Sequence, residues 1–554
     1  ELIDNMLTLR KFLKYGVTNN LFDPQALLNF RETDMGLKDK LKFKIILNKI
    51  YRTMKKVGIK KDCFKNNLSG KILDIFLLII NNNINFTNDQ KNAIDKIVDF
   101  IAKPFNSANH IIGLTGAGGT GKTFIINYIL KNCKYSDSVI ACTSPTHKAC
   151  RVFSQALNGK DVNTIQSTFG FRLDLRLEDF NPKQPQFNPM ATPKLDNIKL
   201  LLIDEASMLP AKLVTYICNK CKELSIKIIF IGDSSQLPPV NENKSIAFLR
   251  CGEVCQLNEI VRQSSNNPIT DLLVLLRNDI KNKTYTFLEY LSRHRGEYSY
   301  NEFGEGFTIC SPEKFKEIID LSFSNEEYTK NIDMYRIVAY TNTCVTSWNN
   351  YIRNSIIKDS DKAIVTKNDL IMSYETIVNE FLETIINNSE EYIINDIVNF
   401  TDATYGFKGF LVKFQLVHGG KITKPLFIID HKDRFSIQKY IQVIEDLVSD
   451  AKKATGGTRA AKWKKYFDFK KKYLLATNII NRSGQILYSR DLDYGFAITS
   501  HKSQGSTYDN VFVDVNNMVF DSNGKPYVGI DDMLRRLYVA CSRSRKNLIL
   551  CYGV

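Results

Sequence analysis

The sequence contains no run of eighteen or more apolar residues. Its most apolar stretch, Ile75 to Ile80, is bounded by Asp74 and by three asparagines at 81–83. A stretch of that length suits a core helix and not a membrane span. The first residues also show no basic segment followed by an apolar run and a cleavage site, which argues against secretion. We find no internal repeat and no long low-complexity tract, so solenoid and fibrous classes are excluded.

Cysteine, by contrast, is not scarce, and its spacing raises the question of a metal site. Cys218 and Cys221 form a C-x-x-C pair, and Cys251 and Cys255 follow about thirty residues later. The residues between the two pairs include 228–231, an apolar run typical of a buried strand. We therefore interpret these cysteines as reduced core thiols, and a zinc ribbon as the weaker alternative.

Size and charge set the broad class. The chain has 554 residues, well beyond the size at which a single core keeps growing, so three or four domains are expected. Seventy-five Lys and Arg against fifty-nine Asp and Glu leave a net charge of +16. Such a surface binds polyanions by releasing their counterions, and nucleic acid is the first candidate partner. The alternative is a basic solvated surface without a partner, and charge alone does not separate the two.

The chain divides by its hydrophobic rhythm. Residues 1–84 have apolar positions at helical spacing, for example Leu41, Ile45 and Ile50, which predicts an N-terminal helical domain. From 85 the pattern changes to short β-branched strands alternating with helices, typical of a parallel α/β sheet. The predicted strands are 111–114, 139–142, 200–203 and 228–231 in the first sheet, and 337–340, 495–499 and 511–515 in a second.

The predicted domain boundaries follow these changes of rhythm. They are an N-terminal helical accessory domain at 1–84, a first parallel-sheet domain at 85–262 with a small insertion at about 171–195, a second domain at 263–355 and 481–554, and a larger, partly β insertion at 356–480. Within that insertion, apolar residues at helical spacing from Tyr440 to Leu447, a break at Gly456-Gly457 and a second helical stretch from Thr458 predict a helical hairpin. Residues 451–475 carry nine basic residues and one acidic residue, interleaved with aromatic residues. This composition favours a track for single-stranded nucleic acid, and packing of the aromatic residues against the parent domain is the alternative.

A glycine-rich motif gives the first chemical assignment. Residues 116–123 match G-x-x-x-x-G-K-[ST] in full, between a predicted strand and a predicted helix. Such a loop cradles phosphate oxygens with its backbone N–H groups at the positive end of a helix. Lys122 then supplies a charge for the β- and γ-phosphates, and the Thr123 hydroxyl is a Mg²⁺ ligand.

Two further apolar strands end in polar groups. The first ends in Asp204 and Glu205, and paired carboxylates at the end of a buried strand are expensive without a function. Asp204 fits a second Mg²⁺ ligand, and Glu205 fits the base that orients the attacking water. The second strand leads into residues 232–240, where the amide of Gln236 can sense the γ-phosphate. A proline-stiffened loop without function is the alternative for that segment.

In order and spacing, these segments resemble the motifs of superfamily 1 helicases, and "TSPTHKA" and "SHKSQGST" resemble the 1B branch with its RecD-like and Dda-like proteins. The similar segments are the Q motif at 86–90, motif I at 116–123, motif Ia at 143–149, the following strand-contacting motif at 164–167, motif II at 204–207, motif III at 232–239, motif IV at 257–263, motif V at 498–507 and motif VI at 537–543.

The resemblance implies an α/β fold of two RecA-like domains that close on ATP, with an SH3-like character for the larger insertion. It also implies arginines reaching the γ-phosphate from the far side of the cleft, where a planar guanidinium can clamp the transferring group. The residues implied at the ATP site are, as catalytic groups, Lys122, Glu205, Gln236, Arg262 and Arg543; as nucleotide-binding groups, Gln90, Gly116, Gly118, Gly119, Thr120, Gly121, Lys122, Thr123 and Gly505; and as Mg²⁺ ligands, Thr123 and Asp204.

The resemblance further implies a strand-binding surface that holds phosphates and sugars without reading bases. Its residues are Pro145, Thr146, His147, Thr164, Thr341, Asn342, Thr499, His501, Lys502 and Ser503. Taken alone, a His or Thr is more often a core or capping residue. Phe169, Phe171 and Trp348 are candidate stacking platforms, with core packing an equally good interpretation.

The motifs and the resemblance predict an ATP-dependent single-stranded DNA translocase and DNA helicase, and the resemblance to the 1B branch alone implies movement from 5′ to 3′. Expected cofactors are ATP and Mg²⁺. Expected partners are single-stranded DNA, duplex junctions and proteins of replication, recombination or repair, with no membrane. We expect a monomer in the cytoplasm, or in the host cytoplasm if a phage encodes it. The alternatives are an RNA or RNA–DNA remodelling helicase, and a nucleotide-gated DNA-binding subunit of a larger assembly.

Overall fold

The computed structural model describes most of the chain after residue 85. The described residues are 86–133, 135–171, 194–239, 242, 244–259, 267–325, 327–328, 331–357, 360, 362–378, 384–417, 419–420, 422–481, 483 and 485–553. The predicted helical domain at 1–84, most of the predicted insertion at 171–195, and Arg262 lie outside them. Every element below belongs to one compact unit, Asn88–Val554. In these described segments no helix has both the length and the apolar character needed to cross a membrane.

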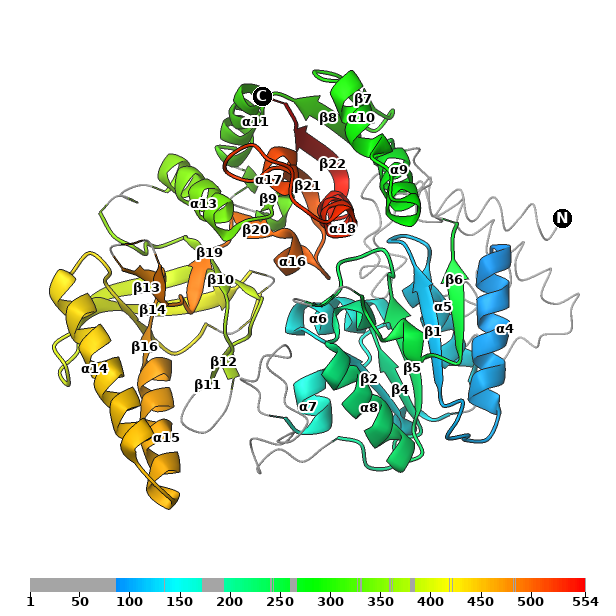
Figure 1. The fold of residues 1–554 in the computed structure, drawn as a ribbon, viewed down its shortest axis with the longest axis horizontal. Helices are drawn as coiled ribbons and strands as arrows, with labels where there is room; N and C mark the ends of the chain where they lie inside the picture. Colours follow the sequence, from blue (N-terminus) through cyan, green and yellow to red (C-terminus); the bar gives the residue numbers. More distant parts are fainter. Residues whose placement is uncertain are drawn as a thin grey trace, which may run out of the picture. The chain divides into compact units, whose positions relative to one another are not determined.

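The first domain is built on a six-stranded sheet in the order β3-β2-β4-β5-β1-β6, in which every pairing is parallel (Figure 1). Its strands are β1 Ile111–Gly116, β2 Ile140–Ser144, β3 Asn163–Thr164, β4 Leu200–Ile203, β5 Lys227–Gly232 and β6 Glu253–Leu257. Its helices are α4 Asn88–Ala102, α5 Lys122–Asn132, α6 His147–Ala156, α7 Ile165–Phe169 and α8 Ala211–Glu223.

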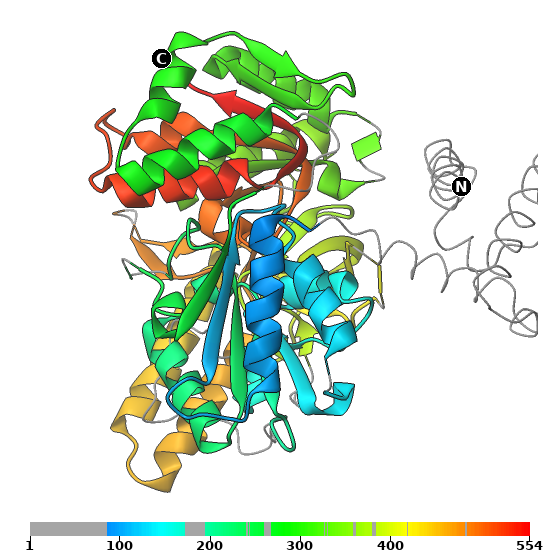
Figure 2. The ribbon, with the colours of Figure 1, turned by 90° about the vertical axis from the view of Figure 1, so that its right-hand side faces the viewer.

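Both faces of this sheet are covered, which explains its continuous apolar strands. In β4, Leu200 and Leu202 pack with residues of α4, α5 and α6, whereas Leu201 and Ile203 pack with residues of α7 and α8. Figure 2 shows α4 (blue) lying along one face of the sheet. The buried run predicted from the β-branched residues is therefore the centre of a three-layer domain.

The second domain repeats this architecture. Its sheet has the order β20-β9-β21-β22-β8-β7, parallel except for the edge strand β7. The strands are β7 Tyr298–Tyr300, β8 Gly306–Cys310, β9 Tyr335–Ala339, β20 Ala497–Thr499, β21 Tyr508–Asp514 and β22 Ser544–Cys551. The helices are α9 Ile269–Asn282, α10 Thr286–Arg293, α11 Pro312–Phe323, α13 Asn342–Ile356, α16 Ser500–Ser503, α17 Val515–Val519 and α18 Ile530–Cys541. Single 3-10 turns are η3 Asp137–Val139, η5 Ala206–Met208, η6 Phe248–Arg250 and η7 Ile332–Met334.

Between α13 and β20 the chain forms the predicted insertion. Its main sheet has the order β16-β15-β14-β13-β10-β19 and is antiparallel except for the β15–β16 pair. The strands are β10 Leu370–Ser373, β11 Ile377–Val378, β12 Thr384–Ile386, β13 Glu391–Thr401, β14 Lys408–Leu416, β15 Leu426–Ile429, β16 Tyr473–Leu474, β17 Ile479–Ile480, β18 Ile486–Tyr488 and β19 Leu492–Tyr494. The partly β character is thus present, and the SH3-like description stays a prediction. Because β19 pairs with β10, this sheet extends past the boundary placed at 480.

The helical hairpin is present in the insertion as α14, Arg434–Lys453, and α15, Gly457–Lys472. It projects from the inserted sheet (yellow and orange in Figures 1 and 2). Tyr440 on α14, Phe469 on α15 and Tyr473 on β16 are buried in one cluster with strand residues such as Phe427. For these aromatic residues the packing alternative is therefore correct, and they do not form a nucleic-acid track.

The predicted fold class of two RecA-like parallel-sheet domains with inserted subdomains is confirmed for the described residues.

Candidate nucleotide and strand-binding site

The nucleotide motifs meet because of the strand order. β4, β5 and β1 are neighbours in the first sheet and run parallel, so their carboxyl ends lie at one edge. Asp204 follows β4, Asp233 follows β5, and Gly116 ends β1. Ligands of open α/β sheets bind outside the carboxyl ends of the strands. The geometry therefore gathers the three motifs into one candidate site.

The loop from Gly116 to Lys122 has the backbone of a phosphate cradle. Gly119 and Gly121 have φ of 84° and 87°, a conformation that glycine adopts without strain. A Cβ added at Gly116 would lie 2.7 Å from the Thr120 hydroxyl and 2.8 Å from the Leu257 carbonyl. At Gly118, nothing would lie within 4 Å of the added Cβ, so this side of the loop is open. The open side leaves room for a phosphate against the backbone.

Lys122 begins α5 and folds back over its own loop. Its Nζ donates to the carbonyls of Gly116 at 2.6 Å and Ala117 at 2.9 Å. Thr123, the predicted Mg²⁺ ligand, is the next residue and is partly exposed. The ammonium group therefore lies against the loop. A bound phosphate could replace the two carbonyls as its hydrogen-bond acceptor.

Gln90 supports the loop from behind. Its side-chain amide is buried and donates to the Thr120 carbonyl at 2.9 Å, and Thr120 donates through its hydroxyl to Ala117. Asp89 accepts hydrogen bonds from the backbone and side-chain amides of Asn258, at 3.0 and 3.2 Å. The segment similar to the Q motif thus connects α4 to the glycine-rich loop at 116–123, the P-loop, and also to the residue after β6.

The two carboxylates after β4 are partly buried. Burial, together with the charge of the neighbouring Glu205, raises the pKa of Asp204 to about 7. Burial also raises the pKa of Glu205, which the charges of Arg543 and Lys122 partly oppose. Buried carboxylates with raised pKa values are typical of sites that take a cation or a proton.

Glu205 is held in a strained conformation and has an unused acceptor. Its φ of 50° is in the left-handed region, which costs about 1 kcal/mol or more for a residue other than glycine. Oε2 of Glu205 and Oε1 of Gln236 are buried without a hydrogen-bond partner among the described residues. Both acceptors therefore have capacity left for a water molecule or ligand in this pocket.

A metal ion is consistent with this donor set. Mg²⁺ prefers hydroxyl, carboxylate and water oxygens, and Thr123 and Asp204 supply the first two kinds. Lys122 lowers the pKa of Asp204, but burial outweighs it, so this carboxylate has capacity for a further positive charge. The residues present therefore fit the ion.

Arg543 brings the second domain to the nucleotide site. Its guanidinium is buried, donates to Val539 O at 2.9 Å and to Ser506 O at 3.2 Å, and interacts electrostatically with Glu205. The predicted role at the γ-phosphate needs a cation from the far side, and Arg543 is placed for it. The other predicted arginine, Arg262, lies outside the described residues.

Three contacts between the domains were not predicted from the sequence. Arg535 Nη1 donates to the carbonyls of Ser234 at 2.6 Å and Gln236 at 3.1 Å, and Gln504 Nε2 donates to Leu237 O at 3.2 Å. Tyr538 hydrogen-bonds Asp233. Arg535 and Tyr538 are three residues apart on α18 and share a face. Tyr538 lies within the segment similar to motif VI and Gln504 within the segment similar to motif V, so those two resemblances, with the spacing on α18, are the signals that could have pointed to these residues.

The four threonines predicted to bind the strand share one local role. Each hydroxyl caps a helix that follows a parallel strand: Thr146 accepts from Ala149 N, Thr164 from Ser167 N, Thr341 from Cys344 N and Thr499 from Lys502 N. In these bonds the hydroxyl oxygen is the acceptor, so its hydrogen remains able to donate. The caps set four helix starts at the carboxyl ends of their sheets, where a phosphate backbone can lie against them.

The remaining strand-binding candidates differ in accessibility. Asn342 is exposed, His147 and His501 are partly buried, and Pro145 and Ser503 are buried. Burial lowers the pKa of His147 to about 4 and also lowers that of His501. Both imidazoles are therefore neutral at neutral pH, and neither acts as a cation.

Two further candidates have neighbours that modify their expected roles. Lys502 Nζ donates to Asn388 Oδ1 at 3.2 Å and Ser389 Oγ at 3.1 Å, so its charge is engaged inside the protein. Gly505, expected at the nucleotide, has a φ of 72°, and a Cβ added there would lie 3.5 Å from Ala149 Cβ. The structure therefore places Gly505 against the start of α6.

The three candidate stacking platforms are core residues. Phe169 and Phe171 are 2% and 0% exposed and stack on each other at 5.9 Å between ring centroids. Trp348 donates through Nε1 to Asp514 at 3.1 Å and packs edge-on against Phe315. The packing interpretation is correct for all three.

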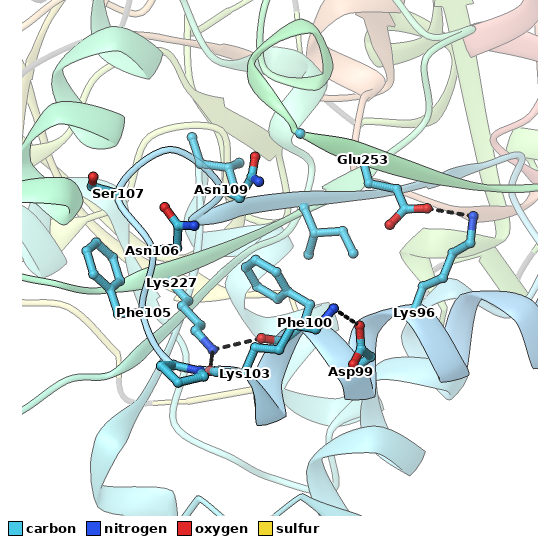
Figure 3. Close-up of a pocket in the computed structure, with 14 residues that line it drawn as sticks. Lys96, Asp99, Phe100, Lys103, Phe105, Asn106, Ser107, Asn109, Lys227 and Glu253 are labelled. Carbon is cyan, nitrogen blue, oxygen red and sulfur yellow. Dashed lines mark hydrogen bonds and ion pairs between the residues drawn. The ribbon is translucent and has the colours of Figure 1, made fainter.

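A cavity of about 750 Å³ lies at the other end of the first sheet, beside Ile111 and Ile112 at the start of β1 (Figure 3). Lys227 Nζ donates there to Phe100 O at 2.7 Å, Ile101 O at 3.1 Å and Lys103 O. These carbonyls end α4, so the ammonium caps that helix. The lysine is fully used in this structural role.

The comparisons with known proteins agree with this geometry. Residues 86–295 match the family model described as AAA domain, and residues 494–551 match that of the UvrD-like helicase C-terminal domain. The chain is 25% identical to the uncharacterized protein R530 of Acanthamoeba polyphaga mimivirus, over 84% of this chain and 99% of that protein.

It is also 25% identical to the ATP-dependent DNA helicase Dda of Enterobacteria phage T4, over 52% of this chain and 60% of Dda. Among solved structures, the Pif1 helicase from Bacteroides in complex with ADP-AlF3 and single-stranded DNA aligns with a TM-score of 0.44 and 16% identity, covering 85% of this chain and 94% of that one. Its ordered motifs, its two parallel-sheet domains and its matches to the AAA domain and to the UvrD-like helicase C-terminal domain are consistent with a superfamily 1B helicase.

Proposed function

We propose that this protein is an ATP-dependent DNA helicase that moves 5′ to 3′ along single-stranded DNA. The observation that carries the proposal is that the nucleotide site needs both domains. The P-loop and the two carboxylates come from the first sheet, and Arg543 reaches the pocket of Glu205 from the second. A site completed by two domains can convert ATP binding and hydrolysis into domain movement.

The P-loop holds the phosphates through the backbone N–H groups between Gly116 and Lys122 and through the Lys122 ammonium. Thr123 and Asp204 would hold Mg²⁺, which when bound neutralises charge on the phosphate oxygens. Glu205 accepts a hydrogen bond from the attacking water and orients it. Its unpaired, buried Oε2 is suited to that role.

Closure places Arg543 opposite the P-loop, where its guanidinium stabilises the charge that develops on the γ-phosphoryl group. Gln236 lies on the loop after β5, whose carbonyls at 234 and 236 accept from Arg535. The side chain of Gln236 can respond to a change at the γ-phosphate, and its backbone carbonyl contacts Arg535 of the second domain. Loss of the γ-phosphate weakens the closed arrangement and lets the cleft reopen.

The strand would lie across the helix starts capped by Thr146 and Thr164 in the first domain and by Thr341 and Thr499 in the second. Hydroxyl hydrogens and helix N-termini bind phosphates without reading bases. Alternate closing and opening of the two domains then moves the protein along the strand. The 5′-to-3′ direction rests on the similarity of the segments at 143–149 and 498–507 to the 1B branch.

The outer surface of the helical hairpin extends this proposal. Lys462, Lys470 and Lys472 pair with Asp450, Asp491 and Asp402. The remaining cations of its tip are exposed and have no ion-pair partner among the described residues, namely Lys452, Lys453, Arg459, Lys464 and Lys465. We call these five residues the hairpin tip cations. We assign them to DNA phosphates outside the motif-bound strand.

The alternatives are separated by one experiment. ATPase activity is measured with poly(dT) and with poly(U), and unwinding is measured on a tailed DNA duplex. Stimulation by poly(dT) with DNA unwinding supports the proposal. Stimulation by poly(U) alone favours the RNA-remodelling alternative, and tight nucleotide-dependent DNA binding without turnover favours the binding subunit.

A further inference from the structure

Two consecutive carboxylates join the inserted sheet to the first domain. Glu391 begins β13, and its side chain and that of Glu390 are 1% and 3% exposed. Lys148 Nζ donates to Glu391 Oε2 at 2.9 Å, and Arg151 Nη1 donates to both oxygens of Glu390 at 2.9 Å. Lys148 and Arg151 are three residues apart on α6 and share a face of that helix. Two ion pairs therefore attach the start of α6 to the start of β13.

The same segment of the insertion also contacts the second domain. Just before the two carboxylates, Asn388 and Ser389 accept hydrogen bonds from Lys502 Nζ on α16. Ser389 has a φ of 63°, so the chain turns sharply there. Residues 388–391, which we call the bridging turn, thus contact α6 in the first domain and α16 in the second. Each helix is capped by a threonine, Thr146 or Thr499, that was predicted to bind the nucleic-acid strand.

A second group of contacts anchors the bridging turn to the second sheet. Glu391 Oε1 accepts from the Tyr508 hydroxyl at 3.0 Å and lies 3.2 Å from Arg336 Nη2. Arg336 on β9 and Tyr508 on β21 are fully buried. Lys148 Nζ also donates to the Tyr508 hydroxyl at 3.2 Å. One carboxylate from the insertion is therefore held by cations from both parallel-sheet domains.

Glu391 is ionised in this arrangement. Burial by itself would raise the pKa of Glu391, but the charges of Arg336 and Lys148 outweigh it and hold the value at about 2. We call the contacts of Glu391 with Lys148, Arg336 and Tyr508 the joint. The joint is therefore ionic at every physiological pH.

The joint is connected through the backbone to the arginine of the nucleotide site. Tyr508 N donates to the Arg543 carbonyl at 2.9 Å, and the Ser506 carbonyl accepts from the Arg543 guanidinium at 3.2 Å. Lys148 thus hydrogen-bonds the side chain of Tyr508, and the backbone of Tyr508 hydrogen-bonds Arg543. Movement of the joint would therefore displace Arg543 at the γ-phosphate site and the helices α6 and α16, whose starts are predicted to bind DNA.

The charges also indicate whether the joint separates during the cycle. Parting it would rehydrate three buried ionic groups at every turnover, and reclosing would desolvate them again, which is expensive. The network is also asymmetric. If Lys148 is removed, Glu391 still contacts Arg336 and Tyr508. If Glu391 is removed, Arg336 and Lys148 are left as uncompensated buried charges.

We propose that the bridging turn is a pivot that stays closed while the nucleotide cleft opens and shuts, and that Lys148 is a positioning residue that couples ATP hydrolysis to strand movement. This inference rests on the proposed helicase function. Lys148 is buried and its ammonium group hydrogen-bonds Glu391 and Tyr508, so it acts through these two residues.

The test is Lys148→Met in the full chain, which keeps the length of the side chain and removes its charge. The readouts are ATP turnover stimulated by single-stranded DNA, and base pairs unwound per ATP hydrolysed. We expect turnover within about twofold of the unaltered protein and unwinding per ATP lower by about fivefold or more, as for a lost coupling between sites. Lys160→Met is the matched control, because Lys160 pairs with Asp137 inside the first domain.

An unchanged yield of unwinding per ATP in Lys148→Met would overturn the inference, and so would a parallel loss of turnover and unwinding. A second variant, Arg151→Met, removes the other ion pair and is expected to lower the yield in the same way. Lys148→Met combined with Glu391→Gln should be no worse coupled than Glu391→Gln alone, and additive losses would contradict the shared network. If the unaltered protein hydrolyses ATP but unwinds nothing, the proposed function fails, and that outcome is visible before any variant is compared.

Discussion

The hydroxyl of Tyr538 donates a 2.7 Å hydrogen bond to Oδ2 of Asp233, and both side chains are buried. Tyr538 is on α18 in the second domain, and Asp233 follows β5 in the first. Burial raises the pKa of Tyr538 well above its ordinary value, and the charge of Asp233 raises it further. The phenol therefore remains a donor, and the bond ties the loop that carries Gln236 to the helix that leads to Arg543.

Tyr538→Phe removes this bond with little change in shape. A buried carboxylate that loses a hydrogen bond costs about 1–3 kcal/mol, and we expect that cost to appear as weaker closure on ATP. DNA-stimulated kcat/KM for ATP should fall about tenfold, with the fold retained. Tyr300→Phe is the control, because Tyr300 is exposed on the edge strand β7 and bonds only Thr308 in the described structure. Equal kinetics for the two variants would show that the Tyr538 bond does not contribute to closure.

Glu205→Gln should separate ATP binding from hydrolysis. The amide keeps the size of the side chain and leaves Asp204 and Thr123 intact, but it cannot act as a base toward water. We expect kcat for ATP to fall by about 10²–10⁴-fold with the dissociation constant for ATP nearly unchanged. Collapse of ATP affinity in a folded variant would instead identify Glu205 as a structural or metal-binding group.

The raised pKa of Asp204 predicts a pH-dependent stability. Between about pH 4 and pH 7 the folded protein holds a proton on Asp204 that the unfolded chain releases. Folded-state proton binding then exceeds unfolded-state binding, so stability falls as pH rises through this window and stays low above pH 7. Asp204→Asn has no such charge to bury. Its advantage in unfolding free energy without metal should grow from pH 5 to pH 8, by on the order of 3 kcal/mol.

Chemical denaturation of both proteins in EDTA measures this difference. Asp196→Asn, an exposed carboxylate of the same domain, is the matched control. A stability advantage of Asp204→Asn that is the same at pH 5 and pH 8 would contradict the burial of an uncompensated carboxylate.

The helical hairpin gives a prediction about DNA affinity. Replacing the hairpin tip cations Lys464, Lys465 and Lys453 by Ala should weaken DNA binding and flatten its dependence on salt. Each DNA phosphate that the protein no longer neutralises reduces the slope of log K against log salt by about 0.7–0.9. ATP turnover at saturating DNA should change little, because no catalytic residue lies in α14 or α15. Lys212 and Lys222, exposed on α8, provide the control replacement. A salt slope equal to that of the control would show that the hairpin does not touch DNA.

Local patterns in the sequence located the nucleotide motifs at the ends of strands that are neighbours in the first sheet. The P-loop, the carboxylates after β4 and the amide after β5 are each contiguous in sequence and follow an apolar strand, so local rhythm places them at one sheet edge. The β-strands of both parallel sheets could be predicted for the same reason. For Phe169, Phe171 and Trp348 the sequence left stacking and core packing open, because an aromatic residue gives the same local signal on a core face as on a binding face.

The joint between the domains could not be predicted from the sequence. Lys148 and Glu391 are separated by 243 residues, and nothing local marks either as ionically paired. In the sequence, Glu390 and Glu391 are two acidic residues before a β-strand, and Lys502 was predicted to bind the nucleic-acid strand. Only the pairing of β10 with β13 and the placement of the inserted sheet bring these groups together.

The central claim is that hydrolysis at the two-domain site drives unwinding of DNA. The most direct measurement is strand displacement from duplexes with a 5′ or a 3′ single-stranded tail, with ATP or a non-hydrolysable analogue, for the unaltered protein and Lys122→Ala. The account predicts displacement from the 5′-tailed duplex with ATP alone, and none by Lys122→Ala. Displacement that persists with the analogue or in Lys122→Ala would contradict it, and so would unwinding confined to the 3′-tailed duplex.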